Sequence, residues 1–199
     1  MPNRVCRIAS SPRQRLALLA IRGGEPRFLG SLVFIGPGAW VEQPRPANRG
    51  RVDTKMVDSQ AWGRPMKVNV YLPPGFRKGR SLPVLSLLNG GGMDADQWFK
   101  TGRVERYTDN LIATKRIRPF AIVMPSSGDA PYTSASEVHI AHEQPLWLQR
   151  THGIKTSRRH TAVAGMSMGG FGAFKLALDH PSLYGFTRAY PVVTDTRYR

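Results

Sequence analysis

The sequence predicts an α/β fold in which helices flank a mostly parallel β-sheet. Three short apolar runs, Leu82–Leu88, Phe120–Met124 and Thr161–Ala164, show no polar alternation and are separated by segments long enough for a helix. Such runs are typical of parallel strands that are buried on both faces. A chain of 199 residues with 41% hydrophobic residues is long enough for one domain with a core.

The first quarter of the chain differs from the rest. Residues 1–51 hold nine of the Arg residues and only two acidic residues, Glu25 and Glu42, and Pro and Gly interrupt them. We interpret them as a weakly ordered extension, with the folded domain over residues 52–199. A short hairpin or a misassigned start codon are the alternatives.

The remaining elements follow in chain order. Residues 66–72 alternate apolar and polar side chains, which predicts a strand with one polar face, and Pro73-Pro74-Gly75 ends it. Phe186–Val193 could form one further strand. The expected helices are Asp94–Lys100, Val104–Thr114, Glu137–Gln149 and Gly169–Asp179. The last of these helices places Phe171, Phe174 and Leu178 on one stripe, and His180-Pro181 ends it.

Composition limits the classes of function. The net charge of +16 would suit an anionic partner, but no RNP-type stretch or zinc-finger spacing is present, so no nucleic-acid partner is expected. No apolar run approaches the ~18–20 residues of a membrane span. The single cysteine, Cys6, rules out an internal disulfide. This favours a cytoplasmic location and leaves secretion open. No metal site or cofactor is expected.

The sequence Gly165-Met166-Ser167-Met168-Gly169 matches the G-x-S-x-G pattern of a nucleophile elbow. In such an elbow a strand turns sharply into a helix, the serine lies on the turn, and small residues are needed on either side. The context fits, because a predicted strand precedes the motif and a predicted helix follows it. The alternative is a glycine-rich turn whose serine only caps the helix.

A second glycine-rich segment, Asn89-Gly90-Gly91-Gly92, directly follows the first apolar run. Acyl transfer requires N–H donors for the oxyanion, and the residue after the nucleophile, Met168, would supply one. Gly91 is the most suitable second donor. A flexible turn without a role is the alternative, and the pattern of a phosphate-binding P-loop is absent.

Taken together, these residues resemble the putative-esterase family of α/β-hydrolases. That family includes S-formylglutathione hydrolase, the antigen 85 mycolyltransferases and feruloyl-type esterases. The resemblance extends from about Val52 to about Phe186. It implies a partial α/β-hydrolase fold with Ser167 as nucleophile, Met168 and Gly91 as oxyanion donors, and the loop Ser126–Ser134 at the rim of the acyl pocket. The matching segments are 70–76, 83–92, 122–125, 164–170 and 176–181.

The sequence departs from the family at two points. The family commonly has His or Asp where this chain has Asn89. In addition, the triad order is serine, acid, histidine, and both partners normally lie many tens of residues beyond the serine. We therefore expect a C-terminally truncated domain and assign no base. His139 and His142 are the only conceivable substitutes, and Asp195 comes too early for the acid and has no histidine after it.

Three hypotheses remain. The first is a serine esterase or acyltransferase that acts on a small-molecule or carbohydrate-linked ester through an acyl-enzyme on Ser167. The second is a catalytically impaired fragment or pseudoenzyme that lacks the triad acid and histidine. The third is an arginine-rich nucleic-acid binder. The sequence specifies neither the acyl group and the alcohol nor the oligomeric state.

Overall fold

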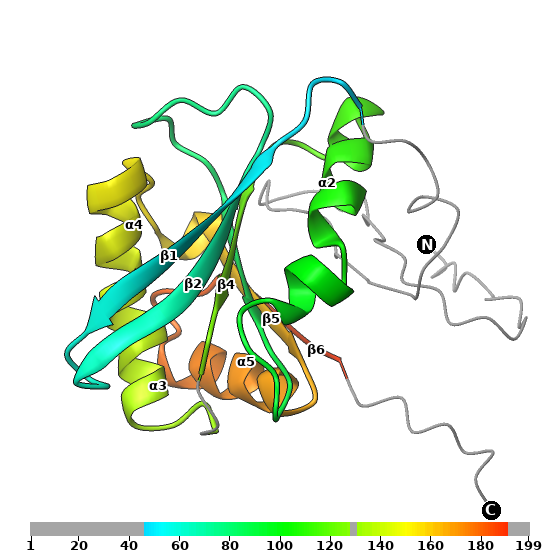
Figure 1. Cartoon of the computed structure of the whole chain (residues 1–199). Coiled ribbons are helices and arrows are strands. Elements are labelled where there is room, and N and C mark those ends of the chain that lie inside the picture. Colours follow the sequence, from blue (N-terminus) through cyan, green and yellow to red (C-terminus); the bar gives the residue numbers. More distant parts are fainter. Residues whose placement is uncertain (1–45, 128–130, 191–199) are drawn as a thin grey trace, which may run out of the picture.

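The computed structural model describes residues 46–127 and 131–190, and in them it shows a six-stranded sheet between layers of helices (Figure 1). The strand order is β1-β2-β4-β3-β5-β6. The strands are β1 (Arg51–Ser59), β2 (Arg64–Leu72), β3 (Val84–Leu88), β4 (Ala121–Pro125), β5 (Thr161–Met166) and β6 (Phe186–Tyr190).

The sheet has a parallel part and an antiparallel part. Strands β4, β3, β5 and β6 run parallel to one another, whereas β2 pairs antiparallel with both β4 and β1. In the register of the two central strands, Leu88 at the end of β3 lies opposite Gly165 near the end of β5. The segments that follow these strands, the glycine-rich loop and the serine turn, therefore emerge side by side at one edge of the sheet.

Helices cover both faces. On one face, Trp98 of the short helical turn η1 (Gln97–Thr101) and Val104 of α2 (Val104–Ala113) pack on side chains of β3, β4 and β5. On the other face lie α5 (Met168–Asp179) and a helical stretch that runs from α3 (Ala135–Val138) through η2 (His139–Glu143) to α4 (Gln144–His152). The core thus lies on both sides of the central strands, as the unbroken apolar runs predicted.

Every strand and helix expected from the sequence is present, with shifts at some ends. The parallel sheet and the flanking helices are confirmed. The Thr161–Ala164 run is confirmed as a strand, β5, which lies in the interior of the sheet between β3 and β6. Strand β1 was missed because its sequence is rich in charged residues and only Val57 and Ser59 are buried.

The structure also shows where two groups of side chains lie, which the sequence pattern left open. The polar face of the 66–72 strand is not solvent-facing, because Asn69 is fully buried beneath the segment that follows the glycine-rich loop. The stripe of Phe171, Phe174 and Leu178 on α5 points outward, and these side chains are 56–67% exposed. Small residues and Leu176 form the inward face of this helix instead, because the helix lies so close to the sheet.

Residues 1–45, most of the predicted N-terminal extension, lie outside the described residues. The end of that range belongs to the folded part. Arg51 pairs with Leu72 in the β1–β2 hairpin, and the Gly50 N–H donates a hydrogen bond to Asp109 Oδ1 over 2.7 Å. Within the described ranges, no helix has the length and apolar character needed to span a membrane.

Candidate active site

Ser167 lies at the turn between β5 and α5 with a backbone conformation that L-residues rarely adopt. Its φ is 56° and its ψ is −121°. A residue other than glycine at positive φ stores strain of roughly 1–3 kcal/mol and persists only where its surroundings fix it. One such restraint is the Ser167 N–H, which donates to the carbonyl of Tyr190 at the end of β6 over 2.9 Å. The turn is therefore a strained strand-to-helix elbow.

The two glycines of the motif are required by close backbone contacts. A Cβ on Gly165 would lie 2.2 Å from the carbonyl oxygen of Gly169, and a Cβ on Gly169 would lie 2.3 Å from that of Leu88. Both distances are far below van der Waals contact, and the atoms that would be struck belong to the backbone. The start of α5 can approach β3 and β5 this closely only because neither position carries a side chain.

The hydroxyl of Ser167 does not cap the helix. Although Ser167 occupies the N-cap position of α5, its side chain forms no capping hydrogen bond. The capping alternative considered for this serine is therefore not what the structure shows. The residue is partly exposed, directly beyond the amino end of a 12-residue helix. The hydroxyl oxygen is thus accessible, at the helix end where negative charge is favoured.

The glycine-rich loop lies beside this turn. A Cβ placed on Gly91 would lie 3.7 Å from Met168 Sδ, so the two residues expected to donate to an oxyanion are neighbours. In the described part of the chain, neither backbone N–H is seen to donate a hydrogen bond. Free N–H groups near a nucleophile are what an oxyanion hole requires, so the position of both residues is compatible with the predicted role.

Side chains fix both ends of this loop, and sequence reasoning missed the roles of Gln97 and Tyr132 among them. Gln97 Oε1 accepts the Gly90 N–H over 2.7 Å, and Asn89 Nδ2 donates to the carbonyl of Met93 over 2.7 Å. The buried Tyr132 hydroxyl donates to Asn89 at 2.9 Å. Asn89, where the family commonly has His or Asp, is therefore fully hydrogen-bonded. Its place next to the glycines marks Asn89 in the sequence, whereas no sequence pattern marks Gln97 or Tyr132.

No histidine ring is seen to contact Ser167 in the described part of the chain. All five lie within the described residues, and their ring contacts are with other groups. The ring of His139 is buried with Nδ1 2.9 Å from Glu143 Oε2. His142 packs on His180, whose Nε2 lies 3.0 Å from Glu137 Oε1. His152 packs edge-on against Phe76 and Trp147, and His160 contacts Ser157.

His180 lies too far along α5 to belong to the site. This residue is the C-cap of the helix whose N-cap is Ser167. At 1.5 Å per residue, the 12 helical residues place the two caps roughly 18 Å apart. A general base must lie within hydrogen-bond reach of the proton that it removes. His180 is therefore too far from the serine hydroxyl to act as its base.

An apolar groove of about 220 Å³ lies at the other end of α5. Its lining combines the last turns of α5 with the start of β6, whereas Ser167 lies at the start of α5 beside the end of β6. This groove is therefore not the acyl pocket. Part of the predicted rim loop Ser126–Ser134, residues 128–130, lies outside the described residues. The described ranges contain no cluster of residues suited to hold a metal ion.

Comparisons with known proteins show which family the chain belongs to. A family model described as "Putative esterase" matches residues 59–193. An esterase of Mycobacterium tuberculosis is 40% identical over 122 residues, which cover 55% of this chain and 25% of the relative. An endo-1,4-beta-xylanase/feruloyl esterase of Xylanibacter ruminicola is 30% identical over 154 residues, 70% of this chain and 21% of the relative.

Solved structures agree with the family match. A ferulic acid esterase superimposes with a TM-score of 0.65 at 26% identity, over 71% of this chain and 58% of that chain. An S-formylglutathione hydrolase from Agrobacterium tumefaciens has a TM-score of 0.60 at 21% identity, over 74% and 60% of the two chains, and shows the shared α/β-hydrolase fold. The chain spans 21–30% of the length of the first curated relatives that it matches.

Proposed function

The chain belongs to the putative esterase family, and we propose that it carries the nucleophile and the oxyanion donors of a serine hydrolase that cleaves carboxylic esters. The observation that carries the proposal is the strained backbone of Ser167, held at a strand-to-helix turn with φ 56° and with its hydroxyl free of a capping bond. Strain of this kind is retained where it serves a site.

The proposed chemistry begins with attack of Ser167 Oγ on the ester carbonyl carbon. The hydroxyl proton passes to a base as the new C–O bond forms, and the carbonyl oxygen becomes an oxyanion. The N–H groups of Gly91 and Met168 stabilise that oxyanion. The bond to the alcohol then breaks, the alcohol leaves with the proton, and an acyl-enzyme remains. Water, or an acceptor alcohol, releases the acyl group in a second step that follows the same course.

We assign the base in this scheme to none of the histidines of the chain, since no histidine ring contacts the Ser167 hydroxyl in the described residues. We infer that a histidine from polypeptide outside these 199 residues completes the site. The 199-residue chain by itself is then a weak esterase, with turnover of a short p-nitrophenyl ester near background. In well-studied serine proteases, loss of the triad leaves roughly 10³–10⁴-fold acceleration over water, but that residual rate presumes an intact pocket, so less is expected of this chain.

The strained serine turn also favours a second candidate function. A protein that keeps the elbow but has no base would bind esters without turning them over. The named activities of the relatives, feruloyl ester cleavage among them, point to methyl ferulate as a ligand to test beside short-chain esters.

Labelling with a fluorophosphonate tests the nucleophile. The folded chain, the same chain unfolded in urea and Ser167→Ala are each incubated with a large excess of probe, and adducts are measured by intact mass. We expect one slow adduct, faster in the folded chain than in urea and absent from Ser167→Ala. An adduct that persists in Ser167→Ala, or equal rates in both states, would remove Ser167 from this role.

A further inference from the structure

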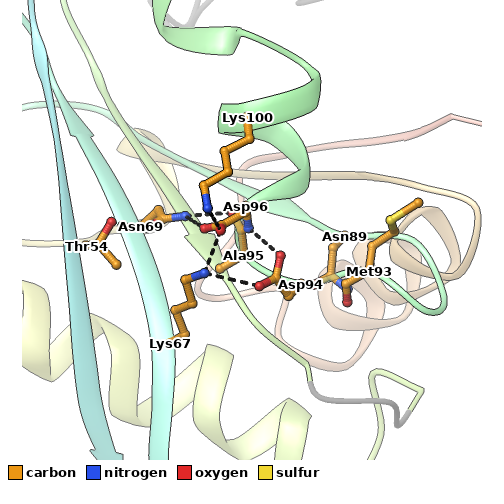
Figure 2. Close-up of polar contacts among 9 residues, drawn as sticks. All are labelled: Thr54, Lys67, Asn69, Asn89, Met93, Asp94, Ala95, Asp96 and Lys100. Carbon is orange, nitrogen blue, oxygen red and sulfur yellow. Dashed lines mark hydrogen bonds and ion pairs between the residues drawn. The ribbon is translucent and has the colours of Figure 1, made fainter.

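A cluster of charged and amide side chains lies between β2 and the segment that follows the glycine-rich loop (Figure 2). The centre of the cluster is the Asp96 carboxylate. Lys67 and Lys100 each place Nζ 2.6 Å from Asp96 Oδ2, and Asn69 Nδ2 donates to Oδ1 over 2.8 Å. Asp94 closes the cluster by accepting the Asp96 N–H at 2.8 Å and by pairing with Lys67 at 3.2 Å.

Asn69 connects this cluster to the sheet. It is fully buried on β2, and both ends of its amide are used. Its Oδ1 accepts the hydroxyl hydrogen of Thr54 over 2.6 Å, and its Nδ2 also donates to the carbonyl of Ala95 over 2.9 Å. A buried amide is tolerated only when its hydrogen bonds are made. The Asn69 side chain therefore holds the loop segment at Ala95 and Asp96 against a central strand.

The loop that contains Gly91 lies between this attachment and the end of β3. At its start it is fixed by Asn89 and by the bond from Gly90 to Gln97. Gly91 and Gly92 themselves are exposed, and the φ of Gly92 is +71°. Two glycines without side-chain restraints have many accessible conformations. The position of the Gly91 N–H therefore depends on how firmly both ends of the loop are held.

We propose that Asn69 and Asp96 are positioning residues that hold the Gly91 N–H beside Met168 for oxyanion stabilisation at Ser167. The inference rests on the proposed function. It adds the residues of β2 and of the 94–96 turn to the site, although none of them touches the reacting atoms. Misplacement of a catalytic group by about 1 Å can cost roughly 10²-fold in rate.

The pKa values of Asp96 and Lys67 indicate that the ion pairs of the cluster persist at neutral pH. Burial alone would raise the pKa of Asp96, but hydrogen bonds from Lys100, Lys67 and Asn69 outweigh it, and the pKa lies well below its usual range. Burial alone would lower the pKa of Lys67, and its bonds to Asp96 and Asp94 raise it instead. Both groups therefore stay charged, and the loop attachment persists.

The test replaces the amide and follows the loop directly. Asn69→Leu keeps the approximate volume and removes all three hydrogen bonds. Thr108→Val is the matched control, because Thr108 is equally buried and its hydroxyl donates only to Val104 within α2. Asp96→Asn is the milder variant if Asn69→Leu fails to fold. Amide hydrogen exchange of Gly90 and Met93, whose N–H groups donate to Gln97 Oε1 and to the Gly90 carbonyl, is measured by NMR, with amides of β5 as the reference for global opening.

We expect hydrogen exchange of the loop amides to be about tenfold faster in Asn69→Leu and in Asp96→Asn than in Thr108→Val. The β5 amides should exchange at the same rate in all three variants when the variants are compared at equal unfolding free energy. The labelling rate of Ser167 is then measured at increasing fluorophosphonate concentration, which gives the affinity for the probe and the maximal rate of labelling. The maximal rate should fall by about 10- to 100-fold while affinity changes less than about twofold, because only the transition state uses the oxyanion donors. The double variant Asn69→Asp with Asp96→Asn restores one amide–carboxylate pair and should recover part of both effects.

The two failures are distinguishable. If Ser167 of the unsubstituted chain takes up no probe, the proposed nucleophile is wrong. Hydrogen exchange of the loop amides alone then decides whether Asn69 and Asp96 hold the loop in place. If loop exchange in Asn69→Leu and Asp96→Asn equals that in Thr108→Val, the positioning inference is overturned, whatever the labelling. Faster loop exchange with an unchanged labelling rate would also overturn it, since the cluster would then hold a loop that Ser167 does not use.

Discussion

The serine turn and the glycine-rich loop lie next to each other, but they are fixed in different ways. The serine turn is fixed by backbone contacts, because Gly165 and Gly169 bring the start of α5 against β3 and β5. The loop is fixed by hydrogen bonds from side chains elsewhere in the chain, such as Gln97, Tyr132 and Asn69. The first arrangement depends on residues adjacent in sequence, and the second depends on residues brought together only by the fold.

This difference gives the two parts different sensitivities. A Cβ on Gly165 or Gly169 would lie 2.2–2.3 Å from a backbone oxygen, so neither position can accept a single methyl group without movement of a strand or a helix. A hydrogen bond from a side chain can be lost one at a time, for about 0.5–1.5 kcal/mol each. Substitutions should therefore cause large, all-or-none effects at the turn and graded effects at the loop.

The largest expected effect is that of Gly169→Ala. Its methyl group would meet the carbonyl oxygens of Leu88 and Asn89, so we expect a loss of more than about 3 kcal/mol of unfolding free energy, or no folded protein. Gly63→Ala is the control, because Gly63 has φ +62° but open space around its Cα, and about 1–2 kcal/mol is expected there. Urea unfolding measures both, and equal losses would show that backbone contact does not fix the turn.

A smaller effect is expected where the loop depends on one hydroxyl. Tyr132→Phe removes the donor to Asn89 and should cost about 1 kcal/mol, measured by urea unfolding. Tyr184→Phe is the matched control, because Tyr184 is 4% exposed and its hydroxyl has no hydrogen-bond partner among the described residues. Its substitution should change stability by less than about 0.5 kcal/mol. Equal costs for the two tyrosines would contradict the assigned role of Tyr132.

The ionic part of the loop attachment predicts a dependence on pH. A carboxylate with a depressed pKa stabilises the fold above its unfolded pKa, and that contribution is lost as the pH falls. Asp96→Asn should therefore be less stable than the unsubstituted chain at pH 7, and the difference should shrink below about pH 4. Urea midpoints at pH 7 and pH 3 test this. A difference that stays constant between these two pH values would show that the charge of Asp96 does not matter.

The smallest effect is expected on the outward face of α5, which takes no part in the close contacts of the turn. Leu178 is 67% exposed, so Leu178→Gln should change the unfolding free energy by less than about 0.5 kcal/mol. The same urea experiment measures it. A loss above about 1 kcal/mol would mean that this face is covered in solution, for example in an assembly.

The same contrast explains what the sequence can predict. Gly165, Ser167 and Gly169 form a local pattern, and the flanking residues indicate a strand and a helix, so the amino-acid sequence alone locates the turn. Asn69 cannot be recognised in this way. In an alternating strand it looks like one of several solvent-facing polar residues, and only the position of the 94–96 turn buries it.

The direction of the stripe on α5 could not be predicted from the sequence pattern for a related reason. Phe171, Phe174 and Leu178 have the spacing of a core-facing stripe, but the glycines of the same helix bring its opposite side against the sheet. Helical spacing alone identifies a face and does not say which side of the helix meets the core. The glycines at 165 and 169 contained that information, since they mark the side of closest approach.

The central claim is that this chain presents a reactive serine beside two oxyanion donors and needs only a base. Added imidazole provides a base, so the rate of fluorophosphonate labelling is measured with increasing imidazole for the folded chain and for the chain in urea. We predict that imidazole accelerates the adduct at Ser167 in the folded chain by at least about tenfold more than in urea, with no adduct in Ser167→Ala. The same acceleration in both states would contradict the account, because the elbow would then contribute nothing to the reactivity of its serine.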